Sequence, residues 1–229
     1  MAFETEVGIT EENFLSLGLD DIEKMGLERS GDLILLSGRP TREMFLHGYS
    51  IGVFAMPIED ELLPQDVYGW FMPKERGVIP IPPLADSVLA DPPRSLRQSM
   101  KRYRAKVDRD FEGVISNCRR TPRPGGWIDD HIEEIFRQLH RDGIAHSVEV
   151  YEGRELVGGL YGVEVNGIFS GESMFHIKRD ASKVALVELV KFCKENDFVL
   201  IETQWNTPHL KSLGAVTLPW LTYLDILRG

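Results

Sequence analysis

Three polar side chains in the C-terminal half of the chain have the types and spacing needed to handle an amine. Glu172 lies in a predicted strand with apolar neighbours, and Glu202 and Gln204 lie two residues apart in a later predicted strand. Because side chains alternate across a strand, Glu202 and Gln204 should share one face. A carboxylate can bind an amino group or accept a proton, and an amide can orient an amine or a carbonyl. A structural hydrogen-bond network is an open alternative for each carboxylate, because burying an unpaired charge is costly.

The segment that must position these residues, 145–204, is typical of alternating strands followed by a helix and a return strand. Glu152-Gly153 and Asn166-Gly167 separate apolar runs, and Asn-Gly in that setting is a strong hairpin signal. This order predicts an α+β fold with a mixed sheet and flanking helices, and it resembles the acetyltransferase superfamily (GNAT-like below). The expected elements are strands at 145–151 and 156–163, a third strand ending at 171–175, a helix at 181–195, and a last strand through 202–204.

A second, smaller domain is expected at the N-terminus. The segment Pro80–Pro93 is rich in proline, which interrupts helices and sheet pairing, so we expect the domain boundary near its start. We therefore predict a small α/β domain at 1–78, with an acidic extension at 1–30, and a GNAT-like catalytic domain at 79–229. Other expected elements are strands at 67–71 and 215–217 and helices at 41–48, 95–103 (capped by Ser95), 110–118, 129–139, 207–213 and from 219.

Composition excludes several classes of protein. Apolar residues make up 42% of the chain and charged residues 27%, which is typical of a globular domain. No apolar run approaches the roughly 18 residues that a membrane span needs, and the acidic N-terminus does not resemble a signal peptide. Cys118 and Cys193 have no paired spacing, so neither a disulfide framework nor a zinc site is indicated. We expect a cytoplasmic protein with no membrane partner.

The net charge of −10 conceals a gradient along the chain. Residues 1–63 contain thirteen acids and four bases, whereas residues 94–123 contain ten bases and three acids. A basic belt on an acidic protein can contact phosphates. A solvated helix face that balances the acidic N-terminus is the alternative that charge alone leaves open.

Motifs for the common cofactors are missing. Coenzyme-A-dependent members of the superfamily bind pyrophosphate at a glycine-rich turn before the helix that follows the third strand. The corresponding stretch here, His176–Lys183, contains no glycine, so the sequence predicts an acyl donor other than coenzyme A. There is no nucleophile elbow, Walker loop or paired-cysteine motif. We expect no cofactor and no metal, with His146 and His209 in structural roles.

A series of short motifs resembles the leucyl/phenylalanyl-tRNA–protein transferases of bacteria, over roughly residues 40 to 225. Many short matches in the same order make the resemblance specific. They are Gly52-Val53-Phe54, Arg76-Gly77-Val78-Ile79-Pro80, Ser99-Met100-Lys101-Arg102, Trp127-Ile128, His146-Ser147-Val148-Glu149-Val150, Leu156–Val163, Gly171–Phe175, Ala181-Ser182-Lys183, Gln204 and Ser212-Leu213-Gly214-Ala215.

This resemblance implies transfer of Leu or Phe from charged tRNA to the N-terminal amine of proteins that begin with Arg or Lys, which marks them for N-degron proteolysis. The aminoacyl ester is already activated, so neither ATP nor coenzyme A is needed. The enzyme must position the amine and assist its deprotonation. By position in the motifs, Glu172 would hold an amino group, Gln204 would orient the attacking amine, and Glu202 would polarise Gln204 or relay a proton.

The same resemblance implies an apolar pocket for the donor side chain and a tRNA surface. The pocket would include Leu160 and Phe169, with Trp127. The other expected contacts are Ser173, Met56 and Thr207 for the substrates, and Arg94, Arg97, Lys101, Arg102 and Arg104 for tRNA.

Two alternative functions stay open. One is a diverged GNAT-like acyl or aminoacyl transferase with another donor or acceptor. The other is a non-catalytic protein that binds tRNA or N-terminal peptides. This second alternative is supported by Glu202, where the family usually has Asp, because one added methylene matters in a catalytic geometry.

Overall fold

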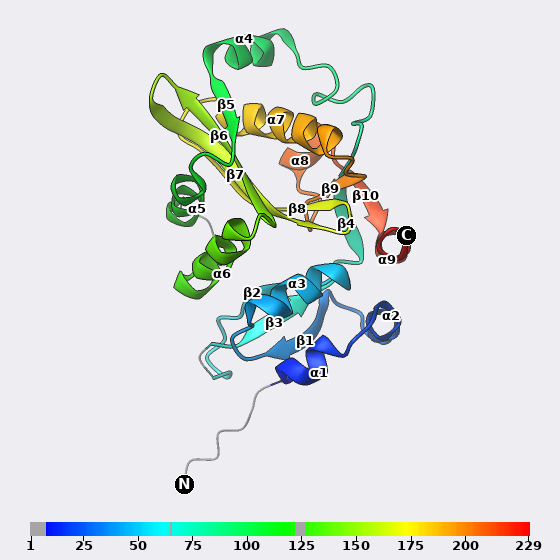
Figure 1. The fold of residues 1–229 in the computed structure, drawn as a ribbon. Coiled ribbons are helices and arrows are strands. Elements are labelled where there is room, and N and C mark those ends of the chain that lie inside the picture. The colour runs from blue at the N-terminus through cyan, green and yellow to red at the C-terminus, as the bar shows by residue number, and fades with distance from the viewer. Residues whose placement is uncertain (1–7, 65, 122–126) are drawn as a thin grey trace. The chain divides into compact units, whose positions relative to one another are not determined.

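We describe the fold from a computed structural model, in which residues 8–64, 66–121 and 127–229 are described. The chain divides into two compact units (Figure 1). One contains the described residues up to Arg76 together with Leu218–Gly229, and the other is Gly77–Thr217. No helix in these described ranges is long and apolar enough to cross a membrane.

The first unit is built on an antiparallel three-stranded sheet. Its central strand β3 (Tyr68–Phe71) pairs with β1 (Leu33–Ser37) and with β2 (Phe54–Pro57). The core is aromatic, since the ring of the fully buried Trp70 lies 4.1 Å from that of Phe14. The helices of this unit are α1 (Glu11–Leu15), α2 (Leu19–Glu28), α3 (Arg42–Ser50) and α9 (Trp220–Arg228).

The C-terminal helix α9 differs from expectation, because it groups with the first unit and not with the rest of 79–229. Trp220, Leu224 and Leu227 are buried, and the last two lie against Gly52 of the first unit. Arg76, the last residue before the break, lies over the ring of Tyr223 at 4.4 Å. Apolar burial, which sequence order does not reveal, therefore decides where the final helix packs.

The second sheet is mixed. β6, β7 and β8 pair antiparallel, and β8 pairs with β9 in parallel. The sheet order is β10-β4-β9-β8-β7-β6-β5. The strands are β4 (Glu75–Pro80), β5 (Arg104–Val107), β6 (Ala145–Glu152), β7 (Glu155–Val165), β8 (Ile168–His176), β9 (Leu200–Glu202) and β10 (Val216–Pro219).

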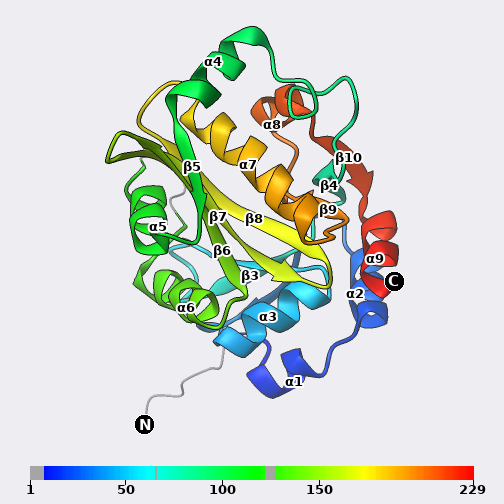
Figure 2. The same cartoon turned by 45° about the horizontal axis from the view of Figure 1, so that its top comes forward.

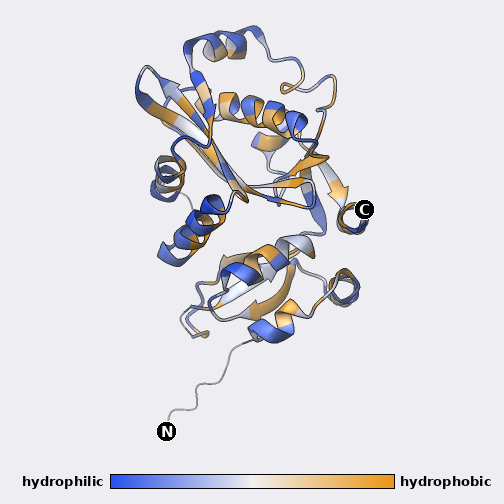
Figure 3. Cartoon of the chain, viewed as in Figure 1, coloured by the Kyte–Doolittle hydropathy of each residue, from blue (hydrophilic) through white to orange (hydrophobic). Residues whose placement is uncertain are grey.

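Different helices cover the two faces of this sheet (Figures 1 and 2). α7 (Ala181–Glu195) packs over a core that includes Leu160 and Phe169. On the other face, rings of α5 (Phe111–Arg120) and α6 (Asp130–Arg141) contact Tyr161. The remaining helices of this unit are α4 (Arg94–Arg102), which shows mainly hydrophilic residues in Figure 3, and α8 (Pro208–Leu213).

The mixed α+β arrangement predicted from the sequence is confirmed. Three local expectations differ. The N-cap of α4 is Pro93, so the expected cap at Ser95 is wrong. β5 was not expected, because its Arg104-Ala105-Lys106-Val107 alternation is hidden in the basic belt. Residues 1–30, expected as an acidic extension, contain α1 and α2 within the part that the structure describes.

Candidate active site

Glu172 is the extra residue of a β-bulge in the middle of the second sheet. Tyr161 of β7 pairs with Ser173 and Gly162 pairs with Gly171, so the register skips Glu172. A bulge bends its strand and aims a side chain away from the regular alternation, and bulges are common beside active sites. Glu172 is thereby directed to the neighbouring Gln204, whose Nε2 lies 3.4 Å from Glu172 Oε1.

Glu202 and Gln204 meet through a turn rather than through strand alternation. β9 ends at Glu202, and Gln204 has the left-handed backbone conformation, with φ of 56°. The Gln204 backbone N–H donates to Glu202 Oε1 at 2.7 Å, and its side-chain Nε2 donates to Glu202 Oε2 at 3.3 Å. The expectation that both residues lie on one strand is therefore wrong. The expectation that their side chains lie close together is correct.

Gly77 holds this turn from the adjacent strand and is a residue that sequence reasoning left without a role. Its N–H donates to the carbonyl of Gln204 and its carbonyl accepts from the N–H of Thr203, both at 2.9 Å. A Cβ at this position would lie 2.7 Å from the backbone nitrogen of Asn206. The absent side chain allows the turn to approach β4 closely. The only signal in the sequence was the Arg76–Pro80 motif.

The three predicted catalytic residues thus form one polar cluster. Glu202 is 1% exposed, whereas Glu172 and Gln204 are half-buried. The amide nitrogen of Gln204 lies between two carboxylates, so its carbonyl oxygen is directed away from them. An amide polarised in this way can accept a hydrogen bond from an amine, and the carboxylates favour a cationic group nearby.

The predicted substrate residues are distributed over both faces of the sheet. Ser173 is the cross-strand partner of Tyr161, and Ser170 is that of Glu202, so these side chains lie on the face covered by α5 and α6. Leu160 and Phe169 lie on the opposite face, in the core under α7.

Trp127 is on the α6 side, where its ring meets that of Phe136 at 6.3 Å. The structure therefore does not bring Trp127 together with Leu160 and Phe169. The pocket expected from these three residues stays a prediction.

Thr207 and Met56 have local structural partners. The Thr207 hydroxyl caps α8 by accepting from the N–H of Leu210. Met56 belongs to the first unit, on β2 opposite Gly69 of β3. Substrate contact by either residue stays a prediction.

All five predicted tRNA contacts are exposed. Arg94, Arg97, Lys101 and Arg102 come from α4, and Arg104 begins β5. Two of them already have partners: Arg97 is paired with Asp91, and Arg102 with Glu152.

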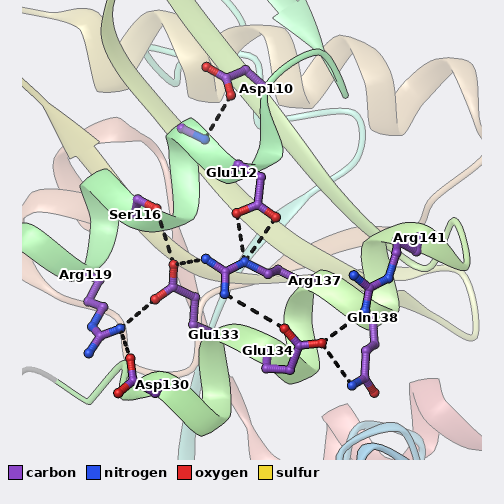
Figure 4. A network of polar contacts seen from close by, with 11 residues as sticks. Asp110, Glu112, Ser116, Arg119, Asp130, Glu133, Glu134, Arg137, Gln138 and Arg141 are labelled. Atoms are coloured by element: carbon purple, nitrogen blue, oxygen red, sulfur yellow. Dashed lines mark hydrogen bonds and ion pairs between the residues drawn. The ribbon is translucent and has the colours of Figure 1, made fainter.

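The other bases of residues 94–123 do not form one continuous surface with these five residues. Arg119 belongs to a network between α5 and α6, where it pairs with Asp130 and donates to Glu133 at 2.8 Å (Figure 4). Arg123 lies outside the described residues. The belt read from the sequence is therefore divided among α4, β5 and a structural network.

The fold and this site define a class of protein. A mixed sheet whose strand ends present an amide between two carboxylates is suited to bringing an amine to an acyl group, with no nucleophilic side chain required. The arrangement is that of an acyl- or aminoacyl-transfer enzyme.

Comparison with known proteins makes the assignment specific. A family model described as leucyl/phenylalanyl-tRNA protein transferase matches residues 88–228. A leucyl/phenylalanyl-tRNA–protein transferase from Gluconobacter oxydans is 40% identical over 192 residues, covering 82% of this chain and 81% of the relative. One from Ruegeria pomeroyi is 43% identical over 183 residues, covering 79% and 82%. The chain belongs to the leucyl/phenylalanyl-tRNA–protein transferase family.

The family resemblance expected from the motifs is thereby confirmed, and the chain is an aminoacyl-tRNA–protein transferase. Among solved structures, the crystal structure of FemX aligns with a TM-score of 0.50 at 10% identity, covering 77% of this chain and 66% of FemX. At that identity the likeness concerns the fold alone.

Proposed function

We propose that this enzyme moves Leu or Phe from charged tRNA to proteins that begin with Arg or Lys, using Glu172, Glu202 and Gln204. The observation that carries the proposal is the set of three hydrogen bonds that fixes the Gln204 side chain and backbone between the two carboxylates. The acetyltransferase-like class of the fold, a cytoplasmic location and a role in N-degron proteolysis belong to the same proposal.

Gln204 orients the attacking amine in this mechanism. Glu202 Oε1 accepts from the Gln204 backbone N–H and fixes the turn, and Glu202 Oε2 accepts from the side-chain Nε2, which increases the electron density on the amide oxygen. That oxygen accepts a hydrogen bond from the neutral amine and aligns its lone pair with the ester carbonyl. Fixed alignment of this kind supplies much of the rate enhancement in acyl transfer.

The proton balance of the reaction is simple. The amine nitrogen forms a bond to the ester carbon, the bond from that carbon to the ribose oxygen breaks, and the ribose hydroxyl is released with one proton from the amine. Glu172 is the carboxylate on the bulge and binds an ammonium group of the donor or acceptor. Two nearby carboxylates also favour an acceptor with a cationic first residue, which supports Arg and Lys.

The exposed bases of α4 and the start of β5 bind the tRNA backbone in this proposal. Arg94, Lys101 and Arg104 are exposed, and within the described residues no carboxylate lies within ion-pair distance of them. Phosphate contacts of this type make affinity strongly dependent on salt.

A substrate panel tests the proposal. The enzyme is incubated with a pool of charged tRNAs and with peptides that begin with Arg, Lys, Met or Asp, and the products are identified by mass. We expect a Leu or Phe added to the Arg and Lys peptides. Extension of the Met or Asp peptides in preference to these would overturn the acceptor assignment, and absence of any extension would favour a binding protein.

A further inference from the structure

A group of basic side chains lies at the start of α7, apart from the α4 residues discussed above. Arg179 is 88% exposed and Lys183 is 37% exposed. His176, at the end of β8, is also exposed, as are His209 and Lys211 on α8. We call these five residues the α7 basic group.

Hydrogen bonds attach this group to α4. The Ser99 hydroxyl donates to Asp180 Oδ2 at 3.2 Å, and the Tyr103 hydroxyl donates to the carbonyl of Arg179 at 3.0 Å. α4 and α8 both lie beside α7 in the second unit (Figures 1 and 2). The α7 basic group is therefore in contact with α4, the helix that carries Lys101.

The group also joins the catalytic turn. α8 begins at Pro208, directly after the turn that contains Gln204, and Thr207 caps it. His209 lies in the first turn of α8. Within the second unit, the group is thus linked to α4 by hydrogen bonds and to the Gln204 turn through α8, which follows that turn in the chain.

The group carries excess positive charge. Asp180 pairs with two of its members, since its carboxylate lies 3.1 Å from Lys183 Nζ and 3.7 Å from Arg179 Nε. Burial lowers the pKa of His209, and the charges of Lys183 and His176 lower it further, so both of these side chains lie near His209. By contrast, Lys178 is neutralised by Glu152 and Glu155 and is not part of the group. Such a cluster is stabilised by an anion.

We propose that the α7 basic group binds the phosphates of the single-stranded 3′ end of the charged tRNA. This inference rests on the proposed function. The ester is on the terminal nucleotide, which must reach Gln204, whereas the duplex stem contacts α4. The connecting strand must cross the surface between them, and a positive groove that follows the backbone is how proteins bind single strands without reading sequence.

The test compares two donors that differ in their phosphates. One is full-length leucyl-tRNA, and the other is leucyl-adenosine, which has the same ester and no phosphate. We expect Arg179→Ala with Lys183→Ala to lower kcat/KM for the tRNA roughly tenfold, as two exposed charge contacts are lost. The salt dependence should become shallower by roughly 1.4 in the log–log slope. Transfer from leucyl-adenosine should be unchanged.

Lys191→Ala is the matched control, because this residue is on the same helix, is 55% exposed and pairs with Glu188. It should leave both donors unaffected. Arg179→Ala alone, with its unfolding temperature measured, separates binding from folding, since Arg179 is nearly fully exposed. Arg179→Lys should restore most of the tRNA activity.

An equal loss with both donors, or no loss with tRNA, would overturn the assignment of the α7 basic group. If the unaltered enzyme transferred from neither donor, the proposed function itself would fail.

Discussion

Two clusters of carboxylates in the second unit are held in different ways. Between α5 and α6, Glu133 is 4% exposed and accepts from Ser116, Arg119 and Arg137 (Figure 4). At the turn that contains Gln204, Glu202 is 1% exposed and accepts from the backbone and side chain of Gln204. Guanidinium groups donate to Glu133, and a neutral amide donates to Glu202.

This difference distinguishes a structural network from a candidate active site. A guanidinium compensates a buried carboxylate with a full charge and fixed geometry, so the α5–α6 network satisfies itself. An amide donates a hydrogen bond without carrying a charge, so the bond to Glu202 orients the Gln204 side chain and does not by itself neutralise the carboxylate. The group that donates to a buried carboxylate therefore says more about the role of that carboxylate than its burial does.

The largest effect is expected at Glu202. Glu202→Gln keeps the shape and removes the charge that polarises Gln204, so kcat should fall about 10²–10⁴-fold with little change in unfolding temperature. Steady-state kinetics and a thermal melt measure the two quantities. Glu202→Asp keeps the charge and shortens the side chain by one methylene, so it should retain activity within about tenfold. Unchanged turnover in Glu202→Gln would mean that the turn is structural as well.

Glu133→Gln should show the opposite pattern. Removing a buried charge that faces Arg119 and Arg137 should lower the free energy of unfolding by about 3 kcal/mol, toward the low end for a broken buried pair. Both arginines keep another acid, Asp130 or Glu112, which limits the loss. Denaturant unfolding measures the stability, and kcat should remain near its usual value. A large fall in kcat without loss of stability would show that Glu133 is not purely structural, and the proposed difference between the two clusters would be wrong.

Gly77→Ala tests whether the turn depends on its backbone anchor. The new Cβ would meet the backbone nitrogen of Asn206 at 2.7 Å and displace the turn. A displacement near 1 Å can reduce the rate about 10²-fold. We expect a lower kcat, with KM for tRNA nearly unchanged. Gly38→Ala is the control, since a Cβ there has open space. Equal activities of the two variants would show that Gly77 does not position Gln204.

The smallest effect is expected at a pair whose charge depends on pH. His146 Nδ1 lies 2.7 Å from Asp108 Oδ2. Burial lowers the pKa of His146, but the hydrogen bond and charge of Asp108 outweigh it and raise that pKa above 6.5. Burial raises the pKa of Asp108, and the bonds from His146 and the Ser147 N–H outweigh it and lower that pKa.

The sign of the pH dependence follows from these two shifts. The stabilisation is complete between about pH 4 and 6.5, is lost as pH rises through the raised pKa of His146, and is lost as pH falls through the lowered pKa of Asp108. Asp108→Asn should flatten the profile and lower the free energy of unfolding by about 1 kcal/mol near pH 6. Melts from pH 4 to 9 check this. If Asp108→Asn had the same dependence of stability on pH as the unaltered protein, the His146–Asp108 pair would not be the cause of that dependence.

The regular elements of the second unit were predictable because their signals are local. Asn166-Gly167 between apolar runs predicts the β7–β8 hairpin, and the 3.6-residue apolar spacing predicts α6 and α7. The bulge at Glu172 and the turn at Gln204 could not be predicted, since both depend on a neighbouring strand. Gly77, distant in sequence from Gln204, illustrates the same point.

By itself the sequence determined the mixed α+β class and the family, because hydrophobic periodicity, turn residues and short ordered motifs are properties of adjacent residues. It also identified Glu172, Glu202 and Gln204 as candidates. Only the tertiary structure decided that these three meet, that Arg119 belongs to a structural network, and that α9 packs with the first unit. Those outcomes depend on contacts between residues far apart in the chain, which packing and charge compensation select after the local elements have formed.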